Sequence, residues 1–348
     1  MSLLAVVFFA QSCSDNNDEP EDSSLSLPGK GLFIVGEGNF QYGNASLSYF
    51  NPADNTVENN VFYRANGMKL GDVGQSMTVY NNTGWVVVNN SHAIFAIDIQ
   101  TGREKGRIEN LTSPRFIEFV SDEKAYVTQM WDNRIVIVNP KTYSVTGYIT
   151  VPGMDAMTGS TEQMVKIGQY MYCTCWSYQN RVIKIDTVTD EIVDEVSPAI
   201  QPKSIVADKN HNLWVMTDGG YEGSPVGHEE PRLFCIDSNT LEILKTFTFT
   251  INSSVTDLNI NGQGDTLYWL DSDVWSMSIS DSSLPSAPLI STPCAYSYAL
   301  TVSPYNNDIY VADAIDFQQS GTVFRYDASG NLITQFNTGV IPGAFCWK

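Results

Sequence analysis

Short apolar segments separated by turn residues recur along the chain, in a unit about 45 residues long. One copy consists of segments 77–79, 84–88, 94–98 and 107–108. Each segment clusters or alternates apolar residues over a few positions, which predicts a short β-strand. Four such strands joined by turns predict one small antiparallel sheet per unit.

Two positions of the unit repeat most clearly. An apolar residue anchors the first strand of each unit, at Met77, Ile117, Met164, Ile205, Leu258, Leu300 and Phe345. The turn after the third strand carries Asp or Asn, which accepts a hydrogen bond from the backbone two residues on, at Asn51, Asp98, Asn139, Asp186, Asp237 and Asp327. This pattern predicts an all-β fold, a seven-bladed β-propeller of four-stranded antiparallel blades.

The two ends of the chain are expected to share the first blade. Residues 31–35 match a second strand of the unit, and residues 341–347 align with the first strands at 113–117 and 201–205. The C-terminal strand would complete the first blade and close the ring, leaving no free inner edge. Six or eight blades remain alternatives, because the sixth unit, at 276–280, lacks the Asp turn residue.

The length of the chain fits one propeller over residues 31–348, and no second domain is expected. The chain has 19 Lys and Arg against 39 Asp and Glu, a formal net charge of −20. This balance argues against nucleic acid as a partner, which needs a basic surface. An acidic surface also favours a soluble monomer.

The N-terminal segment differs from the repeats. Residues 3–10 are apolar but too few to span a bilayer, and small residues precede Cys13, which suits signal-peptide cleavage. The segment resembles a bacterial lipoprotein signal, and the acidic run after it resembles the export signal of surface lipoproteins in Bacteroides-like bacteria. We therefore expect a signal peptide at 1–13 with lipidated Cys13, an acidic disordered tether at 14–30, and a lipid-anchored protein on the extracellular side of the outer membrane.

Five further cysteines follow, so at least one is free. Cys173 and Cys175 lie on one face of a predicted strand. Because no third Cys or His is near in sequence, we predict buried thiols rather than a metal site.

Bulky side chains outside the predicted strands gather in the loops between second and third strands, which all emerge at one end of a propeller. Aromatic rings give flat contact area, and amides donate and accept hydrogen bonds. The set suits a large neutral ligand rich in amides or hydroxyls, although each aromatic alone could simply cap its own blade. The candidate ligand-binding residues are Phe40, Tyr42, Asn89, Asn90, His92, Trp131, Asp132, Trp176, Tyr178, Gln179, Tyr221, Asp316, Phe317 and Gln318.

Sequence signals for catalysis are few. The chain has three histidines and carries no nucleophile elbow, phosphate loop or clustered Cys/His motif. We therefore expect a protein without enzymatic activity or a catalytic cofactor. The alternative is a calcium-dependent propeller lactonase or lyase, with Glu162, Gln163 and Asp257 on inner strands as its candidate residues.

The repeats resemble a known family. Residues 125–128, Ala-Tyr-Val-Thr, resemble the YVTN-type, surface-layer-like propellers. Most of the propeller is closer still to the BtuG-type cobalamin-capturing surface lipoproteins of gut Bacteroides. The segments that carry this likeness are 36–44, 88–92, 159–164, 175–181, 217–225, 312–316 and 341–348.

The resemblance implies a protein that binds cobalamin and related corrinoids outside the outer membrane and passes them to a TonB-dependent transporter of the BtuB type. Its bound ligand would be the corrinoid, whose amide arms and apolar ring match the aromatic and amide residues of the loops. Two other interpretations remain. Exposed aromatics also stack sugars, as in a surface glycan-binding lipoprotein, and the acidic opposite end would suit a structural protein that docks a partner.

Overall fold

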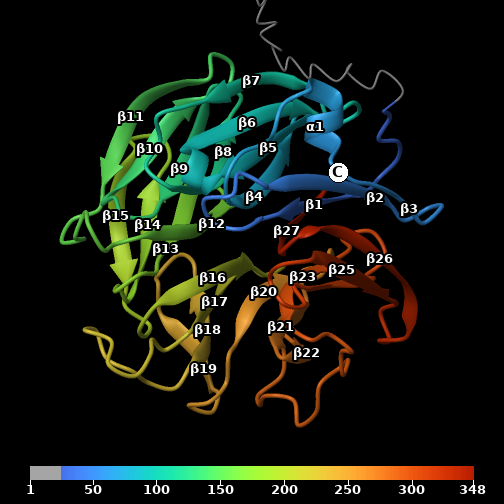
Figure 1. Ribbon diagram of the computed structural model, residues 1–348. Helices are drawn as coiled ribbons and strands as arrows, with labels where there is room; N and C mark the ends of the chain where they lie inside the picture. Colours follow the sequence, from blue (N-terminus) through green and yellow to red (C-terminus); the bar gives the residue numbers. More distant parts are fainter. Residues whose placement is uncertain (1–24) are drawn as a thin grey trace, which may run out of the picture.

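The computed structural model describes residues 25–348, whose strands form seven antiparallel sheets around a central axis (Figure 1). Each innermost strand contacts the innermost strands of the two neighbouring sheets, so the seven sheets make a closed ring. The predicted seven-bladed propeller is confirmed. The expected signal peptide, Cys13 and most of the expected tether lie outside the described residues.

Blades two to five are regular four-stranded sheets, with the strands in chain order from the axis outward. The second blade holds β4 (Gly74–Tyr80), β5 (Thr83–Val88), β6 (Ala93–Asp98) and β7 (Glu104–Ile108). The third holds β8 (Pro114–Ser121), β9 (Lys124–Gln129), β10 (Arg134–Asn139) and β11 (Ser144–Thr150). The fourth holds β12 (Thr161–Ile167), β13 (Tyr170–Cys175), β14 (Arg181–Asp186) and β15 (Glu191–Val196). The fifth holds β16 (Pro202–Ala207), β17 (Asn212–Thr217), β18 (Arg232–Asp237) and β19 (Ile243–Thr248).

Both ends of the chain build the first blade. Its outer strands are β1 (Leu32–Gly36), β2 (Ser46–Asn51) and β3 (Thr56–Glu58), and its innermost strand is β27 (Pro342–Trp347). The seventh blade, β23 (Ser297–Val302), β24 (Ile309–Asp313), β25 (Ser320–Tyr326) and β26 (Leu332–Val340), precedes it. β27 pairs antiparallel with β1, with Phe345 opposite Ile34. The predicted closure of the ring is therefore confirmed, as the contact of red and blue strands in Figure 1 illustrates.

The sixth blade is the irregular one. It has three strands, β20 (Thr256–Ile260), β21 (Thr266–Asp271) and β22 (Asp273–Ser278), in place of four. The expected fourth strand is reduced to one bridge between Val274 and Ile290. The intervening segment contains Pro285 and Pro288, which lack the N–H that a strand needs.

The core lies between the blades. Seven clusters of buried apolar residues occupy the seven interfaces between neighbouring blades. Alternate residues of one strand serve opposite interfaces, because successive side chains point to opposite faces of a sheet. In β5, Trp85 packs toward the third blade and Val86 toward the first.

Outside the blades, a short helix α1 (Val61–Asn66) connects the first and second blades, and a 3-10 turn η1 (Asn89–Ser91) lies between β5 and β6. No helix within residues 25–348 is long and apolar enough to cross a membrane. The packed chain starts before residue 31, because Leu25 and Leu27 are buried in the cluster between the first two blades.

Candidate functional site

The central channel opens into a cavity of about 1360 Å³ at the end where the second-to-third-strand loops emerge. This volume exceeds the roughly 300–1,000 Å³ of common small-molecule pockets. Polar side chains from the innermost strands line it, two positions before the apolar anchor of each strand. The residues at this position are Gln75, Arg115, Glu162, Lys203, Thr256, Tyr298 and Gly343.

A local irregularity turns these side chains toward the axis. Every innermost strand shifts register against its neighbour close to this position, for example between Gly74 and Ser76 and between Pro202 and Ser204. A β-bulge adds one residue to a strand and re-aims its side chain, and bulges are frequent next to functional sites. Seven bulges thus build one polar ring at the mouth of the channel.

Glu37 completes the ring at the one position that lacks a side chain. A Cβ on Gly343 would lie 2.4 Å from Glu37 Oε1, so the glycine makes room for this carboxylate. The Tyr298 hydroxyl donates to Glu37, at 3.0 and 3.1 Å from its two oxygens. Burial raises the pKa of Glu37 to about 7, against the opposing effects of Tyr298 and Arg115.

Asp257 is another carboxylate of the cavity without a cation at ion-pair distance among the described residues. It stands in the bulge of β20 with φ 52°, and its Oδ2 accepts a hydrogen bond of 2.9 Å from the Leu300 backbone N–H. Burial raises the pKa of Asp257 to about 6, with Lys203 opposing the shift.

Glu162, by contrast, forms an ion pair with Arg115. Arg115 Nε donates to both of its oxygens at 3.0 Å, and the Ser160 hydroxyl donates at 2.6 Å. Arg115 also donates to Gln75. This network joins three blades and leaves Glu162 few free acceptor positions.

Trp176 stands between the two cations of the ring. Its ring centroid lies 6.0 Å from the Arg115 guanidinium carbon and 5.7 Å from Lys203 Nζ, within the range of a cation–π contact. Its indole N–H donates to Asp218 at 2.7 Å. The hydrogen bond to Asp218, at the base of the long loop in the fifth blade, therefore fixes the indole ring of Trp176 in place.

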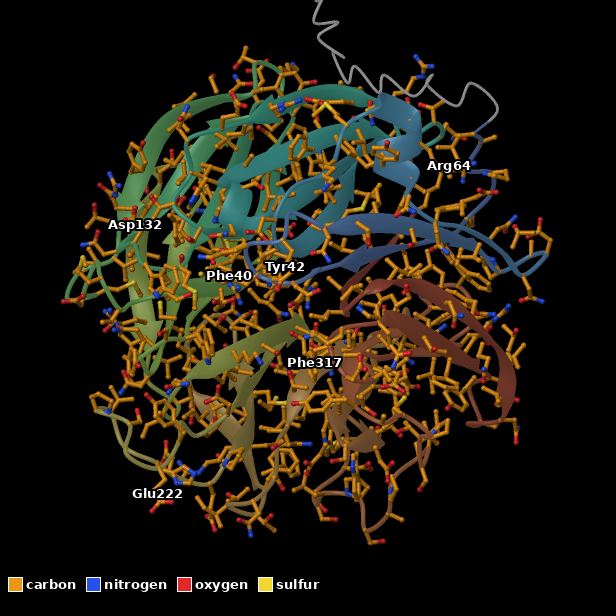
Figure 2. The ribbon with its side chains drawn as sticks, viewed as in Figure 1. Phe40, Tyr42, Arg64, Asp132, Glu222 and Phe317 are labelled. Atoms are coloured by element: carbon orange, nitrogen blue, oxygen red, sulfur yellow. The ribbon has the colours of Figure 1, made fainter. Side chains whose placement is uncertain are left out.

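Aromatic side chains lie in the cavity lining and in the loops at the same end of the propeller. Phe317 packs edge-to-face against Tyr296 and Tyr298, with ring centroids 4.8 and 5.6 Å apart. Five aromatics of the loops and crossovers at this end are between 51% and 75% exposed, and they are Phe40, Tyr42, Trp131, Tyr221 and Tyr296. In Figure 2 the labels of Phe40, Tyr42 and Phe317 lie near the centre, whereas Asp132 lies at the periphery.

The predicted site residues divide into two groups. Tyr221 lines the cavity, and its hydroxyl lies 3.1 Å from that of Tyr178. Trp176 and Phe317 contact residues of the lining. The loop that carries Phe40 and Tyr42 reaches Phe317 through the hydrogen bond from Asn39 Nδ2 to the Phe317 carbonyl, and the labels of all three residues lie near the centre of Figure 2.

The polar residues of the predicted set mostly hold their own loops. Asn89 Nδ2 donates to the Pro114 carbonyl and Asn90 Nδ2 to Asp72. Asp132 is buried and accepts two bonds from the Arg134 guanidinium. The remaining contacts are His92 Nδ1 accepting from the Ser113 N–H, Gln179 bonded to Tyr178 and Arg181, and Asp316 accepting from the N–H groups of Gln318 and Gln319.

Sequence analysis missed Glu37, Arg115, Lys203, Tyr296 and Tyr298. Their signal was available, because Arg115, Lys203 and Tyr298 share the position two residues before an anchor. The calcium candidates Glu162 and Asp257 do line the cavity. No group of three or more His, Cys, Asp or Glu within residues 25–348 is placed to hold a metal ion.

Comparison with solved structures finds other proteins that share the overall fold. A periplasmic gluconolactonase of Pseudomonas aeruginosa superposes with a TM-score of 0.67 at 14% identity, covering 92% of this chain and 99% of that chain. A quinoprotein alcohol dehydrogenase-like protein of Bacteroides thetaiotaomicron superposes with a TM-score of 0.65 at 12% identity, covering 92% and 79%. Likenesses at such low identity establish the fold alone.

A search of curated proteins finds no match to the chain. A family model does match, over residues 30–340, which is nearly the whole propeller. The protein therefore belongs to the family described as Domain of unknown function (DUF5074).

Proposed function

We propose that this protein captures cobalamin and related corrinoids at the cavity end of the propeller. As a lipid-anchored protein of the outer surface, it would deliver them to a TonB-dependent outer-membrane transporter. One observation carries the proposal: the half-exposed Tyr221 and Tyr296 line a large cavity whose polar lining offers both hydrogen-bond donors and acceptors. A corrinoid combines an apolar macrocycle with a periphery of carboxamide arms, and such a ligand needs both kinds of surface.

The position of the aromatics supports the proposal. Of the eight aromatic side chains exposed among the described residues, five lie at the cavity end. The other three, Tyr63, Tyr148 and Tyr305, are spread over α1, β11 and the opposite end. A cluster of exposed aromatics at one concave surface marks an interaction site more strongly than scattered ones do. A closed propeller is also rigid, and a preformed site loses little conformational entropy on binding.

The test is binding of cyanocobalamin to the full chain. Red colour that elutes with the protein from a desalting column shows capture, and an equilibrium titration gives the affinity. Tyr221→Ala and Tyr296→Ala each remove a ring that lines the cavity and is 51% exposed. The double variant should bind at least tenfold more weakly, about 1.4 kcal/mol. The matched control is Tyr148→Ala, a 52% exposed tyrosine on β11, which should bind as the unaltered protein does. A colourless protein fraction, or a double variant with unchanged affinity, would reject capture at this cavity.

Hydrolysis of a lactone is a second candidate function. The gluconolactonase of Pseudomonas aeruginosa shares the fold, and the carboxylates of the cavity lining include Glu37, Glu162 and Asp257. A screen of sugar lactones with and without calcium tests it, with Asp257→Asn as the variant that should abolish turnover. Absence of hydrolysis under both conditions would reject this candidate.

A further inference from the structure

Glu37 and Asp257 differ from Glu162 in what satisfies them, and Glu118, whose pKa burial raises to about 7, also lines the cavity. Glu162 is held by Arg115, whereas neither Glu37 nor Asp257 has a Lys or Arg nitrogen at ion-pair distance among the described residues. Each accepts one hydrogen bond, from the Tyr298 hydroxyl and from the Leu300 backbone N–H respectively. An ionised carboxylate has about four acceptor positions, so both retain capacity toward the cavity.

Both carboxylates are fixed in orientation. Glu37 follows β1 of the first blade and fills the space above Gly343. It accepts a hydrogen bond from Tyr298, which lies on β23 of the neighbouring seventh blade. Asp257 belongs to a bulge with a left-handed backbone conformation and is tied to the neighbouring strand β23. Two acceptors with fixed positions can discriminate between ligands by what those ligands present to them.

The chemistry of the missing partner follows from the electrostatics. Burial disfavours the ionised forms, and it raises the pKa of Glu37 to about 7 and of Asp257 to about 6. A neutral N–H donor entering the cavity stabilises the ionised forms, whereas a second carboxylate beside them is repelled.

We propose that Glu37 and Asp257 are the specificity-determining acceptors of the cavity, selecting ligands whose arms end in carboxamides and rejecting the same ligands with carboxylate arms. This inference rests on the proposed corrinoid capture and specifies it. A cobalamin presents primary amide N–H groups along its periphery, and hydrolysis of one arm exchanges an N–H donor for a negative charge. The cavity would thus favour fully amidated corrinoids.

The experiment compares cyanocobalamin with its monocarboxylic acid derivatives, which differ by one hydrolysed propionamide, on the full chain at pH 8. The derivative whose altered arm meets the two acceptors should bind at least tenfold more weakly than cyanocobalamin. Glu37→Gln and Asp257→Asn replace a carboxylate by an amide that can donate to the ligand's acid group. At least one of these variants should reduce the discrimination to threefold or less.

Glu123→Gln is the matched control, because it removes one negative charge from the exposed turn between β8 and β9. It should leave the discrimination unchanged, and thermal melting checks that all three variants fold. Equal binding of the amide and every acid derivative would overturn this inference and leave corrinoid capture standing. Discrimination that persists in both variants would overturn it as well. No binding of cyanocobalamin itself would reject the proposed function, and this inference with it.

Discussion

The two ends of the propeller are built on different principles. At the end away from the cavity, the turns after the third strands repeat one device, in which an Asp or Asn side chain accepts from the backbone N–H two residues later. All six predicted turns have this bond, at 2.8–3.1 Å, from Asn51, Asp98, Asn139, Asp186, Asp237 and Asp327. The sixth blade substitutes Ser278, whose hydroxyl accepts at 3.2 Å.

At the cavity end the same bond occurs in some loops, at Asp132, Asp218, Asp313 and Asp316, but at no equivalent position from blade to blade. Each loop between second and third strands has its own contacts: Asn39 reaches the Phe317 carbonyl of another blade, and Trp176 reaches Asp218. The comparison indicates that identical local turns suffice to close the blades. Side chains that differ from blade to blade then shape the cavity, and we expect function to reside among them.

The largest effect is expected from opening the propeller, because both of its ends depend on the closed ring of blades. Removing residues 341–348 deletes β27 and exposes the paired edge of β1 and the apolar interface that Phe345 and Trp347 cover. We expect loss of cooperative thermal unfolding and aggregation at room temperature, because an unpaired inner strand recruits other chains. Circular dichroism and size-exclusion chromatography measure both effects.

Removing Lys348 alone is the control. It cancels the bonds of Lys348 to the Gly31 and Leu27 carbonyls and to the Tyr305 hydroxyl, and its contact with the Tyr49 ring, but keeps every residue of β27. This variant should remain monomeric and melt cooperatively. A monomeric, cooperatively folding chain without residues 341–348 would show that closure by β27 is dispensable.

The fold was predictable because its determinants are local and repeated. The anchors and the turn residues recur at each blade, and the alignment of 341–347 with other first strands revealed the closure. The fourth strand of the sixth blade was wrongly predicted, since Pro285 and Pro288 interrupt its hydrogen bonding.

The candidate site was less predictable because its key contacts join distant parts of the chain. Tyr298 and Glu37 are 261 positions apart and meet through ring closure. The inward direction of Arg115 and Lys203 depends on bulges that the pattern of apolar residues does not reveal. Loop residues such as Asp132 and Asn89 carried the right chemistry for a ligand, but the fold engages them in their own turns and neighbours.

The second prediction concerns Glu37, whose buried carboxylate at the cavity end should lower the free energy of unfolding when it is ionised. Its pKa in the folded protein is about 7, above the ordinary 4.5, so the folded state binds the proton more tightly than the unfolded state. The penalty is therefore absent below about pH 4.5 and complete above about pH 7. At pH 8, Glu37→Gln should raise the free energy of unfolding by up to about 3 kcal/mol and raise the melting temperature accordingly. At pH 4 it should leave both nearly unchanged.

Tyr298, Arg115, Lys203 and Asp257 face Glu37, and all four remain in this variant. The exposed Glu123→Gln variant, measured in parallel, should give the same small change at both pH values. If Glu37→Gln melts with an equal offset at pH 4 and pH 8, the carboxylate is not destabilised by burial.

The smallest effect compares one turn device placed at opposite ends. Asp237, after β18, accepts from the N–H groups of Asn239 and Thr240 at 2.8 and 2.9 Å. Asp316, in the loop before β25, accepts from those of Gln318 and Gln319 at 2.9 and 3.1 Å. Replacing either by Ala should lower the unfolding free energy by about 1 kcal/mol, because equivalent backbone bonds are lost.

Only Asp316→Ala should also weaken corrinoid binding, by about two- to fivefold, because its turn positions Phe317 against Tyr296 and Tyr298. Chemical denaturation gives the stabilities, and cyanocobalamin titration gives the affinities. Since the two substitutions remove the same local geometry, any difference in affinity reports the end of the propeller rather than the turn. Equal affinities for the two variants would mean that the aromatic cluster around Phe317 does not contact the ligand. Weaker binding by Asp237→Ala alone would assign the ligand to the opposite end.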